Sequence, residues 1–140
     1  MSVINLLNER LQNKWSFDTT MKIQDEMIPA MIEGKDIVAE SPTGSGKTLA
    51  FMLPILNKVD GSKKKTQALV VAPSQELAMQ IVEVIRQWTE GTDITVQQLI
   101  GGANSARQIE KLKKKPTIVV GTPGRLNELV RQGKLKLKEI

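Results

Sequence analysis

The chain is first informative for what it lacks. Its 140 residues contain no cysteine and no histidine. Without cysteine, disulfides and thiolate metal sites are excluded. Without histidine, Ser-His-Asp and Cys-His mechanisms and most zinc chemistry are excluded as well. No apolar run approaches membrane-spanning length, and the opening segment lacks the apolar core of a signal peptide. We therefore expect a soluble, cytoplasmic protein that does not contact a membrane.

The charge balance is basic. Twenty lysine and arginine residues against 15 aspartate and glutamate residues give a net charge of +5. A polyanionic partner would suit this balance, although many solvated surfaces carry as much charge. The length is that of one domain, and the apolar content of 40% is sufficient for a core.

Apolar periodicity alternates along the chain between strand-like and helix-like segments. We predict helices over 3–12, 20–34, 47–59, 74–91, 105–115 and 122–133, and strands over 36–40, 68–72, 93–100 and 116–121. This alternation predicts an α/β fold with a mostly parallel sheet and helices on both faces. The apolar runs 68–72 and 116–121 are typical of strands covered on both faces. Residues 134–140 indicate a connection, so the pattern stops before its next element.

Local signals set several helix ends. Thr19 or Thr20 is expected to cap the helix over 20–34, and Gly34 to end it. Pro29 inside that helix predicts a kink or a division into two short helices. Ser74 and Gly91 are expected to bound the long helix between them. The last helix has proline just inside its start and glycine just past its end, the usual asymmetry.

The stretch "SPTGSGKT" follows a short apolar run and opens a predicted helix. Gly44 and Gly46 allow backbone conformations that aim successive N–H groups at one point, and the helix start adds positive potential. Lys47 would reach outer phosphates, and the hydroxyl of Thr48 would bind Mg²⁺. The general phosphate-loop pattern has glycine where this chain has Ser41. A plain connecting turn is the alternative.

A second string, "NKVD" over 57–60, matches an element that recognises guanine in GTPases. It lies at the end of the helix that the glycine loop opens, a helix length away from any bound phosphate. We interpret it as a coincidence at a helix C-terminus.

An adenine-binding element is indicated upstream of the loop. The amide of Gln24 can donate to adenine N7 and accept from its N6 amino group. Phe17 could stack on the base. The alternative is that Gln24 is an ordinary glutamine on a helix surface and Phe17 an ordinary phenylalanine of the core.

Together these strings resemble the N-terminal part of the DEAD-box ATP-dependent RNA helicases. "FDTTMKIQ" is similar to the Q motif, F-x-x-P-T-x-I-Q, with Thr20 and Met21 in place of Pro-Thr. "SPTGSGKT" is similar to motif I, with Ser41 and Pro42 in place of Ala-Gln. Five such elements occur in the family's order over nearly the whole chain.

The other three elements lie downstream. "APSQELAMQ" resembles motif Ia, P-T-R-E-L-A-x-Q, with Ser74 and Gln75 replacing Thr-Arg. Gly101 and Gly102 match the GG element, and Thr122 to Arg125 match motif Ib, T-P-G-R, without change. Because Gln75 replaces arginine, a shallower salt dependence of RNA binding is expected at that position.

The resemblance implies a P-loop NTPase of RecA-like fold, here as an incomplete first domain. Residues 1–34 would be leading helices with the Q motif, and residues 35–140 a P-loop α/β core. ATP and Mg²⁺ are the implied cofactors. Phe17 and Gln24 would bind adenine, and the triphosphate and Mg²⁺ would be held by Thr43, Gly44, Ser45, Gly46, Lys47 and Thr48, with Lys47 and Thr48 as the catalytic contributors.

The implied partner is RNA, held by its sugar–phosphate backbone without regard to sequence. The residues carried over to this surface are Pro73, Ser74, Gln75, Gly102, Thr122, Gly124 and Arg125. Each also has a plain structural reading as a helix start or a turn. For the lysine runs 63–65 and 111–115 we favour solvated surface over a dedicated RNA contact.

Turnover needs groups that this chain does not contain. The family's Asp-Glu-Ala-Asp tetrad does not occur in the sequence, and the second RecA-like domain, expected in the parent protein, is absent. The parent is expected to couple ATP hydrolysis to local RNA strand separation, and the 140 residues alone to turn over little or no ATP. The alternatives are another P-loop ATPase or kinase, and a non-catalytic module that binds RNA or a partner.

Overall fold

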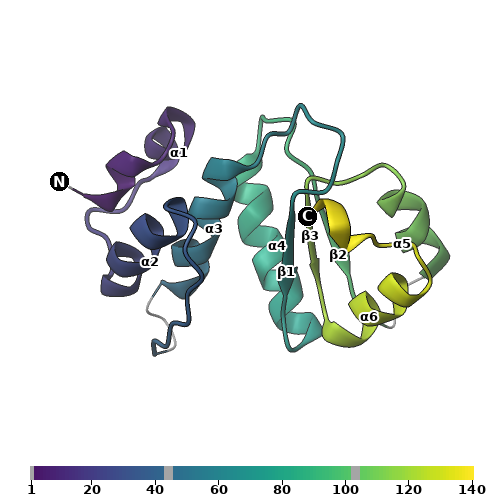
Figure 1. Cartoon of the computed structure of the whole chain (residues 1–140). Helices are drawn as coiled ribbons and strands as arrows, with labels where there is room; N and C mark the ends of the chain where they lie inside the picture. Colours follow the sequence, from purple (N-terminus) through teal and green to yellow (C-terminus); the bar gives the residue numbers. More distant parts are fainter. Residues whose placement is uncertain (1, 43–45, 102–104) are drawn as a thin grey trace. The chain divides into compact units, whose positions relative to one another are not determined.

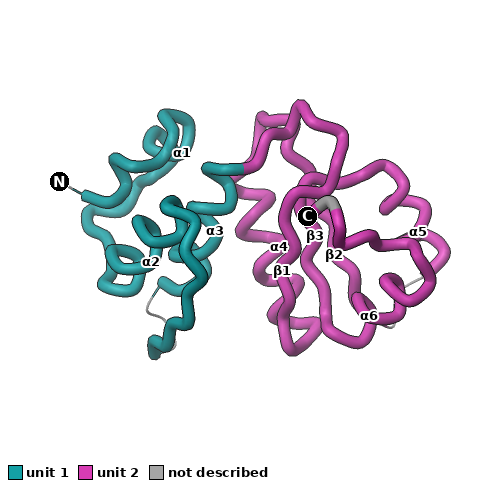
Figure 2. Tube along the Cα trace, in the orientation of Figure 1, with its two compact units in different colours: residues 1–58 teal, residues 59–140 magenta. Residues whose placement is uncertain are grey.

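The computed structural model describes residues 2–42, 46–101 and 105–140 (Figure 1). By its contacts the chain divides into two compact units, which we call unit 1 (Met1–Lys58) and unit 2 (Val59–Ile140) (Figure 2). The division after residue 34, expected from the resemblance, stays a prediction.

Unit 1 is helical throughout its described elements. These are η1 (Val3–Leu6), α1 (Glu9–Lys14), α2 (Lys22–Ile32) and α3 (Lys47–Lys58). The single helix expected over 3–12 is wrong, because Asn8 adopts an extended backbone and starts a new helix there. Its side-chain Oδ1 accepts from the N–H of Leu11 at 3.0 Å, which is a typical N-cap hydrogen bond.

Helix α2 starts differently from the sequence expectation. Neither threonine caps it: its N-cap is Met21, and the hydroxyl of Thr20 instead bonds the carboxylate of Asp25. The side chain of Gln24 accepts from the Met21 N–H at 2.9 Å and so satisfies the helix start from inside the first turn. Pro29 lies within one continuous helix, so the division into two helices is wrong. Gly34 follows the end of α2 with φ of +83°, as predicted.

The strand expected over 36–40 is not formed. Residues 35–42 carry no regular secondary structure, and Val38 is 98% exposed. A strand is held by hydrogen bonds to a neighbouring strand, and every strand of the described residues belongs to unit 2. The prediction of a strand from this apolar run is therefore wrong for the described structure, in which the run has no neighbouring strand.

Unit 2 is a three-stranded parallel sheet with helices. Its strands lie in the order β1-β3-β2. The elements are β1 (Ala68–Val71), α4 (Gln75–Thr89), β2 (Val96–Leu99), α5 (Ser105–Leu112), β3 (Ile118–Gly121), α6 (Pro123–Arg131) and η2 (Leu137–Glu139). The alternation of strands and helices is therefore confirmed for the segment after residue 66.

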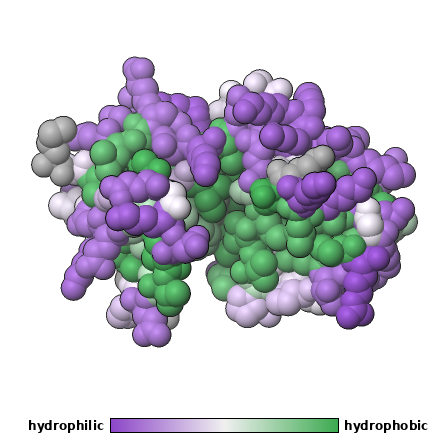
Figure 3. Space-filling view, in the orientation of Figure 1, coloured by the Kyte–Doolittle hydropathy of each residue, from purple (hydrophilic) through white to green (hydrophobic). Residues whose placement is uncertain are grey.

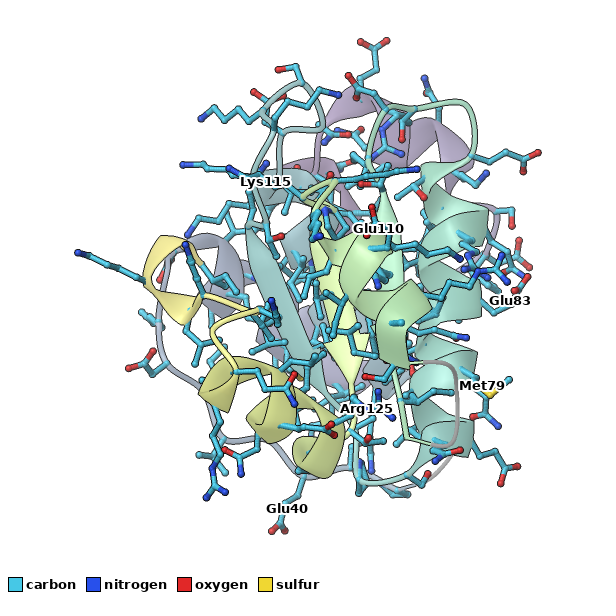
Figure 4. All side chains as sticks on the ribbon, turned by 90° about the vertical axis from the view of Figure 1, so that its right-hand side faces the viewer. Glu40, Met79, Glu83, Glu110, Lys115 and Arg125 are labelled. Atoms are coloured by element: carbon cyan, nitrogen blue, oxygen red, sulfur yellow. The ribbon has the colours of Figure 1, made fainter. Side chains whose placement is uncertain are left out.

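Helices cover both faces of this sheet. On one face, side chains of β2, β3, α5, α6 and the segment after α6 form a buried cluster of Leu99, Leu112, Val119, Leu126, Leu129 and Leu135. Helix α4 contacts β2 and β3 and lies on the opposite side of the sheet from α6 (Figures 1 and 4). The central strand β3 is buried along its whole length, as predicted for a strand covered on both faces.

Strand β1 departs from that expectation. It pairs on one side only within the described sheet, and Val71 at its end is 56% exposed. Figure 3 shows an apolar surface over the sheet of unit 2 in this view. An outer strand keeps one row of backbone groups and part of its side chains accessible, which explains why continuous apolar character did not produce full burial.

The predicted helix ends of unit 2 are confirmed where glycine, proline and serine set them. Ser74 is the N-cap of α4, and its Oγ accepts from the N–H of Leu77 at 3.2 Å. Pro123 is the first residue of α6, and Gly133 follows its end with φ of +70°. Across the described ranges, no helix has the length and apolarity needed to span a membrane.

Candidate nucleotide site and candidate nucleic-acid surface

The Q-motif element and the phosphate-loop element of unit 1 meet through one side chain. Gln24 is only 3% exposed, and its Nε2 donates to the carbonyl oxygen of Gly46 at 3.3 Å. Its Oε1 accepts from the Met21 N–H. A glutamine amide has two N–H donors and two lone pairs, so one of each is left after these bonds. Adenine recognition by Gln24 stays a prediction, now with a structural role beside it.

Gly46 is required by the backbone and by its neighbours. Its φ of +83° is left-handed, a region that side chains rarely adopt. A Cβ built there would lie 2.5 Å from Gln24 Nε2 and 2.9 Å from Met21 Sδ. The last glycine of the loop is thus fixed by the start of α2, so the loop's end has a defined position within unit 1.

Lys47 and Thr48 begin α3 directly after Gly46. Lys47 is exposed and Thr48 is half-buried. The first N–H groups of a helix have no partner within it, and α3 is 12 residues long, so its start can receive an anion. Thr43, Gly44 and Ser45 lie outside the described residues, and their predicted phosphate contacts stay predictions.

Thr48 is the predicted Mg²⁺ ligand, and carboxylates of acidic residues are the other protein groups that usually bind this ion. Within the described ranges, no three acidic residues gather where they could hold a metal ion. The hydroxyl of Thr48 suits Mg²⁺ as an oxygen ligand, but one hydroxyl is a small part of an octahedral shell. Most ligands would have to come from phosphate oxygens and water.

Phe17 lies on the rim of a hollow in unit 1. The hollow has a volume of about 510 Å³ and is lined in part by Trp15, Phe17 and Thr20. Phe17 is 56% exposed, and its ring meets that of Trp15 edge to face at 5.0 Å between centroids. An exposed ring that is held by a neighbouring ring offers a face for stacking. Core packing is therefore not the explanation for Phe17.

In unit 2, the predicted RNA-binding residues gather at one end of the sheet. Parallel pairing aligns Val71 of β1 and Leu99 of β2 with Gly121 of β3, so the segments that follow these strands start at the same edge. Pro73 and Ser74 follow β1, Gly101 follows β2, and residues 122–125 follow β3. Ligands of open α/β sheets bind at this carboxyl edge. The structure brings these elements together, but Gly102 lies outside the described residues.

Gln75 joins two of these segments. Its Nε2 donates to the carbonyl oxygen of Gly101 at 2.8 Å, while the residue itself is exposed. The amide therefore holds Gly101 against the start of α4. A neutral amide can make this hydrogen bond, so Gln75 has a structural role. That role is separate from the phosphate contact that an arginine would make at this position.

Two glycines near β3 differ in what they tolerate. A Cβ on Gly121 would lie 2.6 Å from the Leu99 carbonyl oxygen and 2.7 Å from a methyl carbon of Leu126, so only glycine fits. A Cβ on Gly124 would meet nothing within 4 Å. Packing thus explains Gly121, whereas nothing in the described structure demands glycine at position 124.

Arg125 is held inward. Its side chain is 9% exposed, and its Nε lies 3.6 Å from Glu128 Oε2. Nη1 donates to Gln108 Oε1 at a long 3.5 Å, and Nε is buried without a hydrogen-bond partner in the structure. A guanidinium with a buried, unsatisfied N–H is poised to gain a stronger acceptor. RNA contact by Arg125 stays a prediction.

Gln108 was not among the residues singled out from the sequence. It is 8% exposed, and its Nε2 donates to the Ile100 carbonyl oxygen at 3.0 Å while its Oε1 faces Arg125. It therefore links the segment after β2 to α6. The available signal was its position four residues before Leu112, on the buried face of the predicted helix.

The "NKVD" string has structural partners at both ends. Asn57 Oδ1 accepts from the Asn8 N–H at 2.7 Å, within unit 1. Asp60 accepts from the backbone and hydroxyl of Ser62 within unit 2. These bonds lower the pKa of the Asp60 carboxyl, the side-chain bond contributing most. They agree with the interpretation of this string as a coincidence.

Comparison with known proteins identifies the family. The profile of the DEAD/DEAH box helicases matches residues 21–140. The chain belongs to this family. It is 50% identical over 133 residues to the DEAD-box ATP-dependent RNA helicase CshC of Bacillus cereus and 47% identical over 133 residues to the probable ATP-dependent RNA helicase YfmL of Bacillus subtilis. The alignments cover 93% of this chain but 34% and 35% of those proteins.

Two solved structures have the same fold. A DEAD box protein from Methanococcus jannaschii superposes with a TM-score of 0.89 at 32% identity, over 96% of this chain and 38% of that chain. A hypothetical ATP-dependent RNA helicase from Sulfolobus tokodaii gives 0.84 at 34% identity over 96% of this chain and 39% of that chain. The resemblance inferred from the motifs and the RecA-like α/β fold class are confirmed. The chain spans about a third of the length of these relatives.

Proposed function

We propose that this DEAD-box chain binds ATP in unit 1 and the sugar–phosphate backbone of RNA in unit 2. In the longer protein these activities would couple ATP hydrolysis to local separation of RNA strands. The observation that carries the proposal is the hydrogen bond from Gln24 to Gly46, because it connects the adenine element with the phosphate loop inside one compact unit.

The nucleotide site would combine three kinds of group. The start of α3 and the exposed Lys47 would neutralise the phosphates, which are attracted to helix N-termini. Phe17 would stack on adenine, and the remaining donor and acceptor of Gln24 would pair with its edge. When bound with the nucleotide, Mg²⁺ would offset charge on the phosphate oxygens, and Thr48 would supply one of its ligands.

The RNA surface would be the carboxyl edge of the sheet in unit 2. Hydroxyls, helix starts and glycine backbone there are suitable donors to phosphate and carry no base code. Binding would therefore be independent of RNA sequence. The family's acidic tetrad and the second RecA-like domain, both expected in the longer protein, would together complete the catalytic site.

For the 140-residue chain alone we expect binding without turnover. Hydrolysis requires an acidic residue to help hold Mg²⁺, a group to orient water and a positive group for the developing charge. No acidic cluster of that kind is present in the described residues. An ATPase rate that disappeared in Lys47→Ala would contradict this expectation.

The adenine assignment is tested by titrating the chain with ATP, ADP and GTP in an isothermal calorimeter. Phe17→Ala is expected to weaken ATP and ADP binding by about 5- to 150-fold, because stacking on one base contributes about 1–3 kcal/mol. Leu6→Ala is the matched control, because Leu6 is 52% exposed in the same unit. Gln24→Ala is expected to remove the preference for ATP over GTP. Equal affinity of the unsubstituted chain for both nucleotides would argue against the assignment.

A further inference from the structure

Besides the hollow of unit 1 beside Phe17, a hollow lies in unit 2, and its described lining residues are distinct from those of the proposed nucleotide and RNA sites. It has a volume of about 550 Å³ and runs along the outer edge of β2. Its lining comes from α4, from β2 with the residue before it, from α5 with the turn after it, and from Pro116. In Figure 4, α5 faces the viewer and α4 lies to its right. The residues Thr95 and Pro116 precede their strands, so the hollow extends toward the sheet end opposite to the candidate RNA surface.

Along β2, the backbone hydrogen-bonding groups of successive residues face alternately toward β3 and away from it. β2 pairs only with β3 in the described sheet. The carbonyls of Thr95 and Leu99 accept from Ile118 and Thr122 N–H groups, so backbone groups at positions 95, 97 and 99 face β3. The N–H and C=O of Val96 and Gln98 therefore face outward, into the hollow that both residues line. Such an edge is a template for another extended chain.

The hollow is lined by positive charge. Arg86, Arg107, Lys111 and Lys114 all line it, and no carboxylate is among the described lining residues. The nearby Glu83 of α4 and Glu110 of α5 are exposed outside the hollow, and Glu110 pairs with Lys113 at 3.5 Å. Two residues of the lysine run 111–115 thus flank a sheet edge.

One buried polar atom in this lining lacks a partner. Gln97 is 8% exposed, and its Nε2 donates to the Gln108 carbonyl oxygen at 2.8 Å. Its Oε1 is buried and has no hydrogen-bond partner in the structure. Buried acceptors are almost always paired, so Gln97 Oε1 is an exception within this lining. The atom is closed to solvent, and a ligand in the hollow does not reach it in this arrangement.

We propose that this edge binds an acidic segment of a partner protein in extended conformation, as an added strand beside β2. The outward groups of Val96 and Gln98 would pair with its backbone. Arg86, Lys111 and Lys114 would attract its carboxylates. The alternation of outward backbone groups favours a peptide over RNA, because a phosphate backbone cannot continue a sheet ladder.

The test uses the ¹⁵N-labelled 140-residue chain and the peptide acetyl-Asp-Val-Glu-Val-Asp-Val-Glu-amide. The amide signals of Val96 and Gln98 are expected to shift and to become protected from hydrogen exchange. Val96→Pro removes one outward N–H and leaves the hydrogen bonds between β2 and β3 intact. The affinity of this variant for the peptide should fall by about three- to tenfold. Val96→Thr keeps that N–H and is the matched control.

A second pair of variants tests the charge. Lys111→Glu with Lys114→Glu is expected to weaken peptide binding at least about tenfold, since like charges then meet. Lys63→Glu with Lys64→Glu changes charge equally, outside the hollow, and should have little effect. The proposal is overturned if the peptide shifts neither amide, if Val96→Pro melts normally and binds it with unchanged affinity, or if oligouridylate shifts these amides and the peptide does not.

Discussion

Gln24 and Gly46 are separated by 22 positions, yet one hydrogen bond of 3.3 Å joins the side chain of the first to the backbone of the second. The same glutamine amide completes the start of α2 through Met21. One side chain therefore ties a helix start to the end of the phosphate loop. Its substitution would disturb unit 1 even without a nucleotide, so nucleotide tests need controls for folding.

Gly46→Ala is expected to destabilise unit 1 more than Gly34→Ala does. Both glycines have φ of +83°, so both substitutions incur the left-handed strain of roughly 1–2 kcal/mol. Only at Gly46 does the new methyl group meet neighbours, at 2.5 Å from Gln24 Nε2, which should add about 1–3 kcal/mol. Urea unfolding followed by helical circular dichroism measures both. Equal losses would show that the contact with Gln24 is unimportant.

Gly124→Ala is expected to stabilise unit 2 and to weaken RNA binding. Alanine in a helix gains about 0.5–1 kcal/mol over glycine, and the methyl group meets nothing within 4 Å. The same methyl group would stand between the backbone and a bound phosphate. Urea unfolding and fluorescence anisotropy with a labelled oligonucleotide measure the two effects.

Gly121→Ala is the companion variant, because it places a methyl group against Leu99 and Leu126. It should cost about 1–3 kcal/mol of stability through overpacking. Unchanged RNA affinity in a stabilised Gly124→Ala chain would remove Gly124 from the candidate RNA surface.

Gln75→Arg is expected to steepen the salt dependence of RNA binding. One added phosphate contact raises the slope of log K against log salt by about 0.7 for a single strand. Gln132→Arg adds the same charge at the end of α6, away from the candidate surface, and serves as the control. Anisotropy titrations over a range of salt concentrations give both slopes. If both variants steepen the slope alike, net charge and not position 75 is responsible.

Asp60 should give unit 2 a small dependence of stability on pH. Its pKa lies below the ordinary value of 3.8, first because of the Ser62 hydroxyl and then because of the Ser62 N–H. A lowered folded-state pKa means that the contribution is present above the unfolded value and is lost as pH falls through the folded one. Carbon NMR titration of the Asp60 carboxyl should give a midpoint below 3.8 that rises in Ser62→Ala. An unchanged midpoint would exclude the hydroxyl as its cause.

Much of the fold could be predicted because periodicity and turn residues agree with each other. Ser74, Pro123 and Gly133 mark helix ends by local chemistry, and local chemistry is visible in sequence. The apolar run of β3 was interpreted correctly because both of its faces are covered. The same kind of run gave a wrong prediction of a strand over 36–40 and a wrong prediction of burial at Val71. Strand pairing and burial depend on neighbouring segments, which the sequence of one segment does not specify.

The candidate sites divide in the same way. The positions of Gly46, Lys47 and the helix starts could be predicted, because turn and cap signals are local, while phosphate binding by these residues stays a prediction. The inward position of Arg125 and its contact with Gln108 could not, because they depend on side chains from two helices that are distant in sequence. The threonine caps were wrong because α2 has Met21 as its N-cap, and the Thr20 hydroxyl bonds the Asp25 carboxylate instead.

Strands β1, β2 and β3 end at aligned positions, which limits where residues can be inserted into this sheet. Lengthening one strand by a single residue would raise its following loop by about 3.3 Å and turn the next side chain to the opposite face. Insertions within the connecting loops would leave the register of the strands unchanged. Variation in length should therefore be tolerated beyond Val71, Leu99 and Gly121 far better than before them.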